Sequence, residues 1–148
     1  MKVLVDSNIV LDILLNRSAF ITDSKEIFDL AEKKKIIGYV SASAITDIFY
    51  IASKGIGKDT AREAIKGLLS VFRPATVSDN HIYQALDLDW DDFEDSVQFV
   101  VGEGLAVDYI ITRNTQDFSS SSIRSKLRCG IPAVTPEQFI QTIADIGK

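Results

Sequence analysis

The feature that most limits the fold of this chain is an alternation of short apolar runs with longer amphipathic segments. β-Branched and aromatic residues recur in the short runs, and the longer segments repeat their apolar residues at helical spacing. We expect strands at residues 1–5, 36–40, 75–77, 109–111 and 133–134, and helices at residues 9–15, 23–34, 43–53, 58–72, 79–86, 91–103 and 136–146. Since whole helices separate the strands, the strands pair in parallel, which predicts a three-layer α/β/α fold with a central parallel sheet.

Composition favours one domain in the cytoplasm. The chain has 148 residues, 46% of them hydrophobic, which is enough to bury the core of a single domain over residues 1–148. No apolar run approaches the ~20 residues needed to span a bilayer, so no membrane association is expected. Residues 1–6 lack the apolar stretch of a secretory signal, and the one cysteine, Cys129, cannot form an internal disulfide. These observations predict a cytoplasmic protein.

The charge balance at first counts against a nucleic-acid partner. Lys and Arg number 16 and Asp and Glu 21, giving a formal net charge of −5, whereas nucleic-acid binders are usually basic. The acids are unevenly spread, however, since six of the nine residues from Asp87 to Asp95 are acidic. A solvated loop and a helix N-terminus account for Asp91 and Asp92, but they account less well for Glu94 and Asp95. On a helical wheel Asp95 lies opposite the apolar stripe, which predicts a surface position.

Three other places carry polar residues that fit a ligand site. Asp6 directly follows the first strand, and ligand sites in open parallel sheets lie beyond the carboxyl ends of the strands. Capping of the next helix by Asp6 or Ser7 is the alternative interpretation. Residues 112–117, which follow the fourth strand, are again polar. Asp47 lies in an otherwise apolar helix, where it either contributes to a site or flanks the apolar stripe and faces solvent.

Together these places predict a metal site. Carboxylates without His or Cys beside them suit a hard cation such as Mg²⁺ or Mn²⁺. Such an ion can activate water and neutralise charge on a phosphodiester during cleavage. The only histidine, His81, lies outside every motif and is expected on a helix surface.

Three segments match a known family in their order and spacing: VLVDSNIVLD at residues 3–12, DFEDS at residues 92–96 and IITRNTQDF at residues 110–118. Together they resemble the PIN domain, and the similarity extends from residue 1 to Phe139. The branch they are most similar to is the toxin of prokaryotic VapC-type toxin–antitoxin pairs. The resemblance implies a metal-dependent ribonuclease with an acidic quartet at the carboxyl edge of the sheet.

Carried onto this sequence, the resemblance implies that the catalytic acids are Asp6, Asp47, Asp95 and Asp117. Asp47 stands where the family usually has Glu, one methylene longer, so it is expected to reach the metal through water. Asp6, Asp95 and Asn114 are the expected metal ligands. Asn114 and Asp117 both remain candidates for the last position of the quartet.

Four further residues are expected beside the metal ligands or against the substrate: Ser7, Asp92, Thr112 and Arg113. Asp92 precedes Asp95 by one helical turn. Ser7 and Thr112 can hydrogen-bond a phosphate, although turn and cap bonds explain them equally well. Arg113 begins a basic stretch that either contacts RNA phosphates or only keeps the surface soluble. The other basic residues of this stretch are Arg124, Lys126 and Arg128.

The resemblance therefore implies an endonucleolytic toxin that hydrolyses RNA with Mg²⁺ or Mn²⁺, binds a cognate antitoxin and forms a homodimer. A receiver domain would have paired acids at its first strand and a haloacid-dehalogenase-like phosphatase would have Asp-x-Asp, whereas here Asp6-Ser7-Asn8 follows the strand. A catalytically silent PIN-like module that only binds protein or RNA remains the alternative.

Overall fold

The computed structural model describes residues 1–17, 19, 21–115 and 130–147. Its strands form one parallel sheet of five, in the order β3-β2-β1-β4-β5. The strands are β1 (Lys2–Val5), β2 (Ile37–Ser41), β3 (Arg73–Ala75), β4 (Tyr109–Ile111) and β5 (Ala133–Val134). The helices are α1 (Ser7–Leu14), α2 (Ile21–Glu32), α3 (Ala42–Ile56), α4 (Lys58–Leu69), α5 (Asp79–Leu88), α6 (Phe93–Leu105) and α9 (Pro136–Ile146). The parallel α/β architecture expected from the sequence is confirmed.

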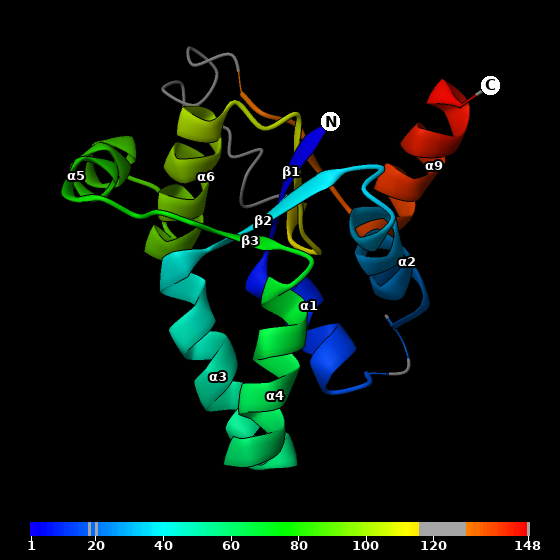
Figure 1. Ribbon diagram of the computed structural model, residues 1–148. Coiled ribbons are helices and arrows are strands. Elements are labelled where there is room, and N and C mark those ends of the chain that lie inside the picture. Colours follow the sequence, from blue (N-terminus) through cyan, green and yellow to red (C-terminus); the bar gives the residue numbers. More distant parts are fainter. Residues whose placement is uncertain (18, 20, 116–129, 148) are drawn as a thin grey trace.

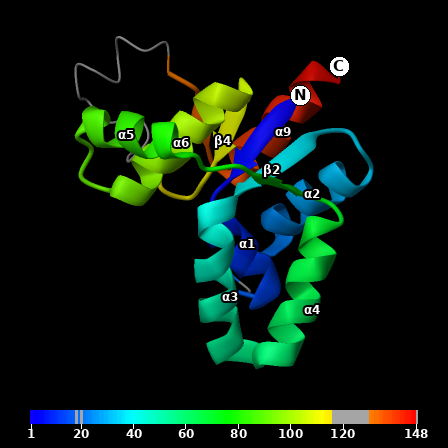
Figure 2. The same ribbon diagram turned by 60° about the vertical axis from the view of Figure 1, so that its left-hand side comes forward.

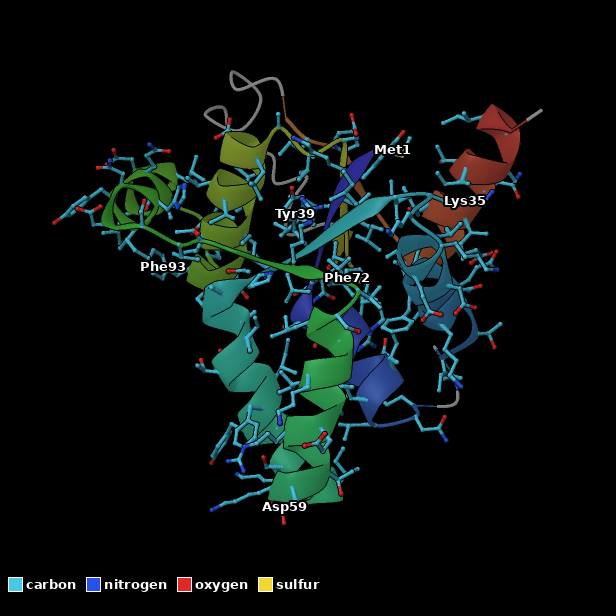
Figure 3. All side chains as sticks on the ribbon, viewed as in Figure 1. Met1, Lys35, Tyr39, Asp59, Phe72 and Phe93 are labelled. Atoms are coloured by element: carbon cyan, nitrogen blue, oxygen red, sulfur yellow. The ribbon has the colours of Figure 1, made fainter. Side chains whose placement is uncertain are left out.

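Helices cover both faces of the sheet and so make three layers (Figures 1 and 2). Side chains alternate between the faces along each strand. Val3 and Val5 of β1 pack with α1, α2 and α9, and Leu4 between them packs with α5 and α6. Phe72 belongs to the same hydrophobic cluster as Val3 and Val5, and Tyr39 packs against the cluster that contains Leu4 (Figure 3). The sheet is therefore buried on both sides, as its apolar strands require.

The helices α3 and α4 form a hairpin that extends beyond the carboxyl edge of the sheet (Figure 1). The sequence predicted a break over residues 54–57, but α3 continues through Gly55 and ends at Ile56. The chain turns at Gly57, whose φ of 85° only glycine adopts without strain. Because β2 leads directly into α3, the first turns of α3 lie beside the ends of the strands.

The third strand also differs from the expectation. It was predicted after Pro74, at residues 75–77, but β3 contains Pro74 and ends at Ala75. Proline is tolerated there because β3 is an edge strand of the sheet and pairs on one side only. Within the described residues, no helix combines the length and the apolar character that crossing a membrane requires.

The strand order reverses beside β1, and this reversal positions the site. From β1 the chain moves outward through β2 and β3, then returns through α5 and α6 to β4 on the other side of β1. In sheets of this kind the crevice beyond the carboxyl ends of the two strands at the reversal binds ligands. Val5 is in register with Ile111, so Asp6 and Thr112 emerge next to each other. The Asp6 amide donates to the Ile111 carbonyl at 2.9 Å.

Candidate functional site

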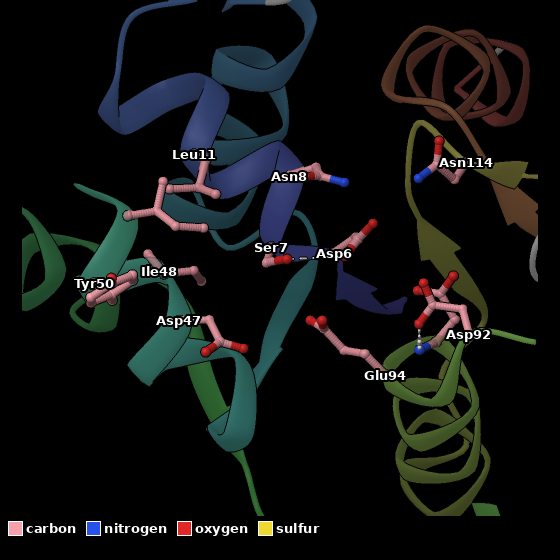
Figure 4. Close-up of a pocket in the computed structure, with 12 residues that line it drawn as sticks. Asp6, Ser7, Asn8, Leu11, Asp47, Ile48, Tyr50, Asp92, Glu94 and Asn114 are labelled. Carbon is pink, nitrogen blue, oxygen red and sulfur yellow. Dashed lines mark hydrogen bonds between the residues drawn. The ribbon is translucent and has the colours of Figure 1, made fainter. Parts of the chain in front are cut away.

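A cavity of about 340 Å³ opens at this crevice (Figure 4). Three parts of the chain supply its acids: the end of β1, the helix α3 and the N-terminal turn of α6. The residues that line it are Asp6, Ser7, Asn8, Leu11, Asp47, Ile48, Tyr50, Ile51, Asp92, Glu94, Asp95 and Asn114. The sequence-predicted residues Asp6, Asp47, Asp95 and Asn114 are thus brought together around one space.

Asp6 is the most firmly held acid of the cavity, with 4% of its surface exposed. Its Oδ1 accepts hydrogen bonds from Gln98 Nε2 at 3.1 Å and from Ser7 Oγ at 3.4 Å, and its Oδ2 accepts from Thr112 Oγ1 at 2.8 Å. Asp6 occupies the N-cap position of α1, but its side chain accepts no capping bond from the described residues of that helix. The capping interpretation therefore fails, and the carboxylate is oriented by neutral donors from α1, from α6 and from the residue that follows β4.

Asp95 is buried, with 7% of its surface exposed, so the surface position predicted by the helical wheel is wrong. A wheel assumes one buried face, whereas every residue of α6 from Asp95 to Gly102 is buried. The helix lies between the sheet and α5, and its N-terminus is directed at the cavity. Positive charge at that helix end favours an anionic side chain in the first turn.

Asp92 lines the cavity and also caps α6. Its Oδ1 accepts the Asp95 amide hydrogen at 3.0 Å, shown as the dashed line beside Asp92 in Figure 4. This bond satisfies one of the amides that a helix N-terminus leaves without an intrahelical partner. The predicted association of Asp92 with Asp95 is thus a backbone contact, and it fixes where α6 begins.

Asp47 and Glu94 approach each other from opposite walls of the cavity (Figure 4). Both side chains are exposed. Asp47 therefore contacts solvent and also lines the cavity, so the two sequence-based alternatives for it are not exclusive. The cavity walls nevertheless remove part of the water around the Glu94 carboxyl, and this partial burial raises its pKa; the negative charges of Asp6, Asp47 and Asp92 raise it further. Since like charges oppose ionisation, the shift indicates that these four acids share one electrostatic environment.

The residues after β4 divide between the cavity and a contact behind it. Thr112 is fully buried and hydrogen-bonds Asp6, whereas Asn114 is exposed and lines the cavity. Arg113 does not line this cavity among the residues described; its Nε lies 3.2 Å from Oδ2 of the buried Asp12 in α1. Asp117 lies outside the described residues, as do Arg124, Lys126 and Arg128, so their predicted roles remain predictions.

The residues present fit a divalent cation by the chemistry of their donors. The cavity offers carboxylate and amide oxygens, and no His or Cys occurs among its described lining residues. In the described part of the chain no three Asp, Glu, His or Cys side chains converge closely enough to surround one ion. Asp47 and Glu94 are exposed, so rotation of their side chains toward Asp6 meets little steric resistance.

Three residues in or near the site, Glu94, Gln98 and Asp12, were not selected from the sequence. Glu94 stood in the acidic run, where helix capping explained it poorly. Gln98 is one helical turn beyond Asp95, and this spacing could have indicated that it faces the same way. Asp12 lay inside the apolar stripe of α1, where an acid needs a partner. His81, by contrast, forms a capping box with Ser78 at the start of α5 and takes no part in the site.

Residues 2–116 match the sequence profile of the PIN domain family. No curated protein matches the chain significantly. Several solved structures share its fold at low sequence identity. VapC20 of Mycobacterium tuberculosis, described as a toxin that cleaves the sarcin-ricin loop, has a TM-score of 0.61 and 17% identity, covering 73% of this chain and 86% of its own.

Two toxin–antitoxin complexes are similar to the same extent. VapBC2 from Rickettsia felis, bound to a DNA fragment from its promoter, gives a TM-score of 0.65 and 15% identity over 80% of this chain and 92% of the other. A toxin–antitoxin complex from Klebsiella pneumoniae gives a TM-score of 0.62 and 20% identity over 90% of this chain and 97% of the other. At these identities the likeness concerns the fold, and it agrees with the three-layer arrangement of helices and sheet.

Proposed function

This chain belongs to the PIN domain family, and on that premise we propose that it is a ribonuclease that depends on Mg²⁺ or Mn²⁺. One observation carries the proposal: acids from β1, α3 and α6 line a single cavity at the carboxyl edge of the sheet, beside the reversal of strand order. This is the place where the fold binds ligands, and the donors are those a hard cation takes.

Asp6 and Asp95 are the proposed ligands of the cation, with Asn114 as a neutral oxygen donor and Asp47 and Asp117 as further acids of the quartet. When bound, the cation supplies positive charge that stabilises the transition state of phosphodiester hydrolysis and promotes ionisation of water. Thr112 and Gln98 hold the Asp6 carboxylate in one orientation, and Ser7 contacts the same oxygen as Gln98. A ligand that is already oriented loses little entropy when the cation binds.

The biological proposal is narrower. The similar folds include a toxin that cleaves RNA and complexes of toxins with antitoxins. We therefore propose an endonucleolytic toxin that acts on RNA in the cytoplasm, is held by a cognate antitoxin and forms a homodimer. Inducible expression with and without the neighbouring gene, followed by mapping of new RNA ends, tests this role. Growth arrest and new ends that the neighbouring gene suppresses are expected, and their absence contradicts it.

The chemical proposal is tested by Mn²⁺ calorimetry and RNA cleavage with three variants. Asp6→Asn and Asp95→Asn should each lower kcat/KM at least ~100-fold and abolish Mn²⁺ binding, because several kcal/mol of charge stabilisation is lost. Asp29→Asn is the matched control, since it removes an exposed acid of α2 that is remote from the cavity. Retained cleavage in both site variants would refute the assignment. A wild-type chain that binds no Mn²⁺ would identify the silent binding module instead.

A further inference from the structure

Asp12 is a buried charge outside the cavity that the proposed reaction does not use. Its side chain, in the last turns of α1, has no exposed surface. Arg113 Nε lies 3.2 Å from one carboxylate oxygen and Arg17 Nη1 lies 3.5 Å from the other. Burial raises the pKa of Asp12 above its ordinary value, and the charges of Arg113 and Arg17 offset only part of this rise. An ion pair between a buried acid and guanidinium groups costs desolvation free energy to form, and removing one partner costs stability because the other charge is left unpaired.

Asp12 is connected to the site acid Asp6 through Arg113 and its chain neighbour Thr112. Arg113 lies between Thr112, whose hydroxyl donates to Asp6 Oδ2 at 2.8 Å, and Asn114, which lines the cavity. The Asn114 amide donates to the same Thr112 hydroxyl oxygen at 3.1 Å. The turn of residues 112–114 is therefore held by its middle residue on one side and contacts the site with its two outer residues on the other.

Both ends of α1 are tied to this turn. Asp6 precedes the first residue of α1 and binds Thr112, while Asp12 lies near the last residue and binds Arg113. Two attachments on one rigid helix restrict both the translation and the rotation of the turn relative to Asp6. Displacement of about 1 Å at a catalytic group can cost roughly 100-fold in rate, so such a restraint has a functional consequence.

We propose that Asp12 is a positioning residue that acts through Arg113 to hold the turn of residues 112–114 against Asp6 and the cavity. The inference rests on the proposed metal-dependent cleavage, and it assigns Arg113 to this ion pair and not to an RNA phosphate. Arg17 serves as the internal comparison, because it contacts the same carboxylate but lies on the loop after α1 and forms no hydrogen bond or ion pair with residues 112–114 in the described part of the chain.

The first measurement is amide hydrogen exchange on the metal-free protein, which requires no activity. Asp12→Asn and Arg113→Gln should each speed exchange of the Asn114 amide at least about tenfold, because the turn loses its anchor. The Asp6 amide, bonded to Ile111 within the sheet edge, should not change and so reports that the fold is intact. Arg17→Gln should leave the Asn114 amide within about twofold of wild type. The Arg113 side chain is 27% exposed, so its replacement should be tolerated. If the exchange rate of the Asn114 amide is unchanged in Arg113→Gln, the proposal is overturned, even where Asp12→Asn fails to fold.

The second measurement is steady-state RNA cleavage at saturating Mn²⁺. Asp12→Asn, Arg113→Gln and the double variant should lose kcat by the same factor, roughly 10- to 100-fold, as residues that orient metal ligands do, with KM nearly unchanged. Equal losses in single and double variants show that the two residues act as one unit. Arg17→Gln should keep kcat within about twofold.

Three results contradict the proposal or its premise, and they are distinguishable. If Arg113→Gln raises KM and flattens its salt dependence while Asp12→Asn does neither, Arg113 contacts RNA directly and the positioning role is wrong. If all three single variants, Arg17→Gln included, lose kcat in parallel with stability, the role is structural only. If wild-type protein neither binds Mn²⁺ nor cleaves RNA, the proposed function fails, and the exchange data alone judge whether Asp12 holds the turn.

Discussion

Asp6 and Asp12 are two buried carboxylates on the same helix segment with opposite surroundings. Asp6 receives its hydrogen bonds from neutral donors and lies among other acids, whereas Asp12 lies against two guanidinium groups. Asp12 thus has positively charged partners within the protein that offset part of its burial, and Asp6 has neutral donors and acidic neighbours. A carboxylate that the fold keeps oriented but electrically uncompensated is suited to a cation, and one that is compensated is suited to holding structure.

The largest effect expected from this comparison is on stability. Asp12→Asn should lower the free energy of unfolding of the metal-free protein by about 2 kcal/mol, because the loss of the counter-charge of both arginines outweighs the relief of the burial that raises the Asp12 pKa. Asp6→Asn should change it by no more than ~1 kcal/mol, since the lost acceptor is offset by weaker repulsion among the acids. Urea unfolding in EDTA measures both, and equal losses would show that the two acids do not differ as described.

An intermediate effect is expected at Thr112, which links the two acids. Thr112→Val keeps the shape but removes the hydroxyl bonded to Asp6 and to the Asn114 amide, so it should cost about 1 kcal/mol of stability and lower cleavage ~10-fold. Thr142→Val in α9 is the matched control, since its hydroxyl donates to the Gln138 carbonyl within that helix. Unaltered cleavage in Thr112→Val would show that orientation of Asp6 does not limit the reaction.

The smallest effect concerns Glu94 and pH. Its pKa is raised in the folded state, so its contribution to stability is full below about pH 4 and is lost as the pH rises through the folded-state value. Glu94→Gln should therefore raise the Tm of the metal-free protein at pH 7 by about 1–2 °C, and the gain should vanish below about pH 4. Scanning calorimetry in EDTA measures this difference.

Glu26→Gln, an exposed acid in the middle of α2, controls for the loss of one charge. A Tm gain for Glu94→Gln that persists at low pH would mean that repulsion within the cavity is not its cause. Added Mn²⁺ sharpens the comparison, because a ligand that binds the folded state raises its Tm. If the Glu94 carboxylate helps to hold the ion, Mn²⁺ should raise the Tm of wild type more than the Tm of Glu94→Gln.

Local sequence signals were sufficient for the architecture, and they placed Asp6 at the edge of the sheet where the cavity lies. Short β-branched runs between helices require parallel pairing, and parallel pairing places Asp6 and residues 112–114 at one edge of the sheet. Position along the chain left Asp6 as either a helix cap or a site residue, and the resemblance to the PIN domain favoured the site. Errors arose where a side chain's surroundings come from other elements, as for Asp95 on a helix buried all round and for Pro74 in an edge strand.

The sequence by itself determined which residues follow strand ends and which stripes of the helices are apolar, because both depend on the periods of the backbone. Only the tertiary structure decided which acids are compensated. Asp6 and Asp12 are both Asp near the ends of one short helix, and no local pattern distinguishes them. Their difference arises because Arg113, brought alongside by the pairing of β1 with β4, reaches Asp12 and not Asp6, and electrostatic energy depends on distance in space.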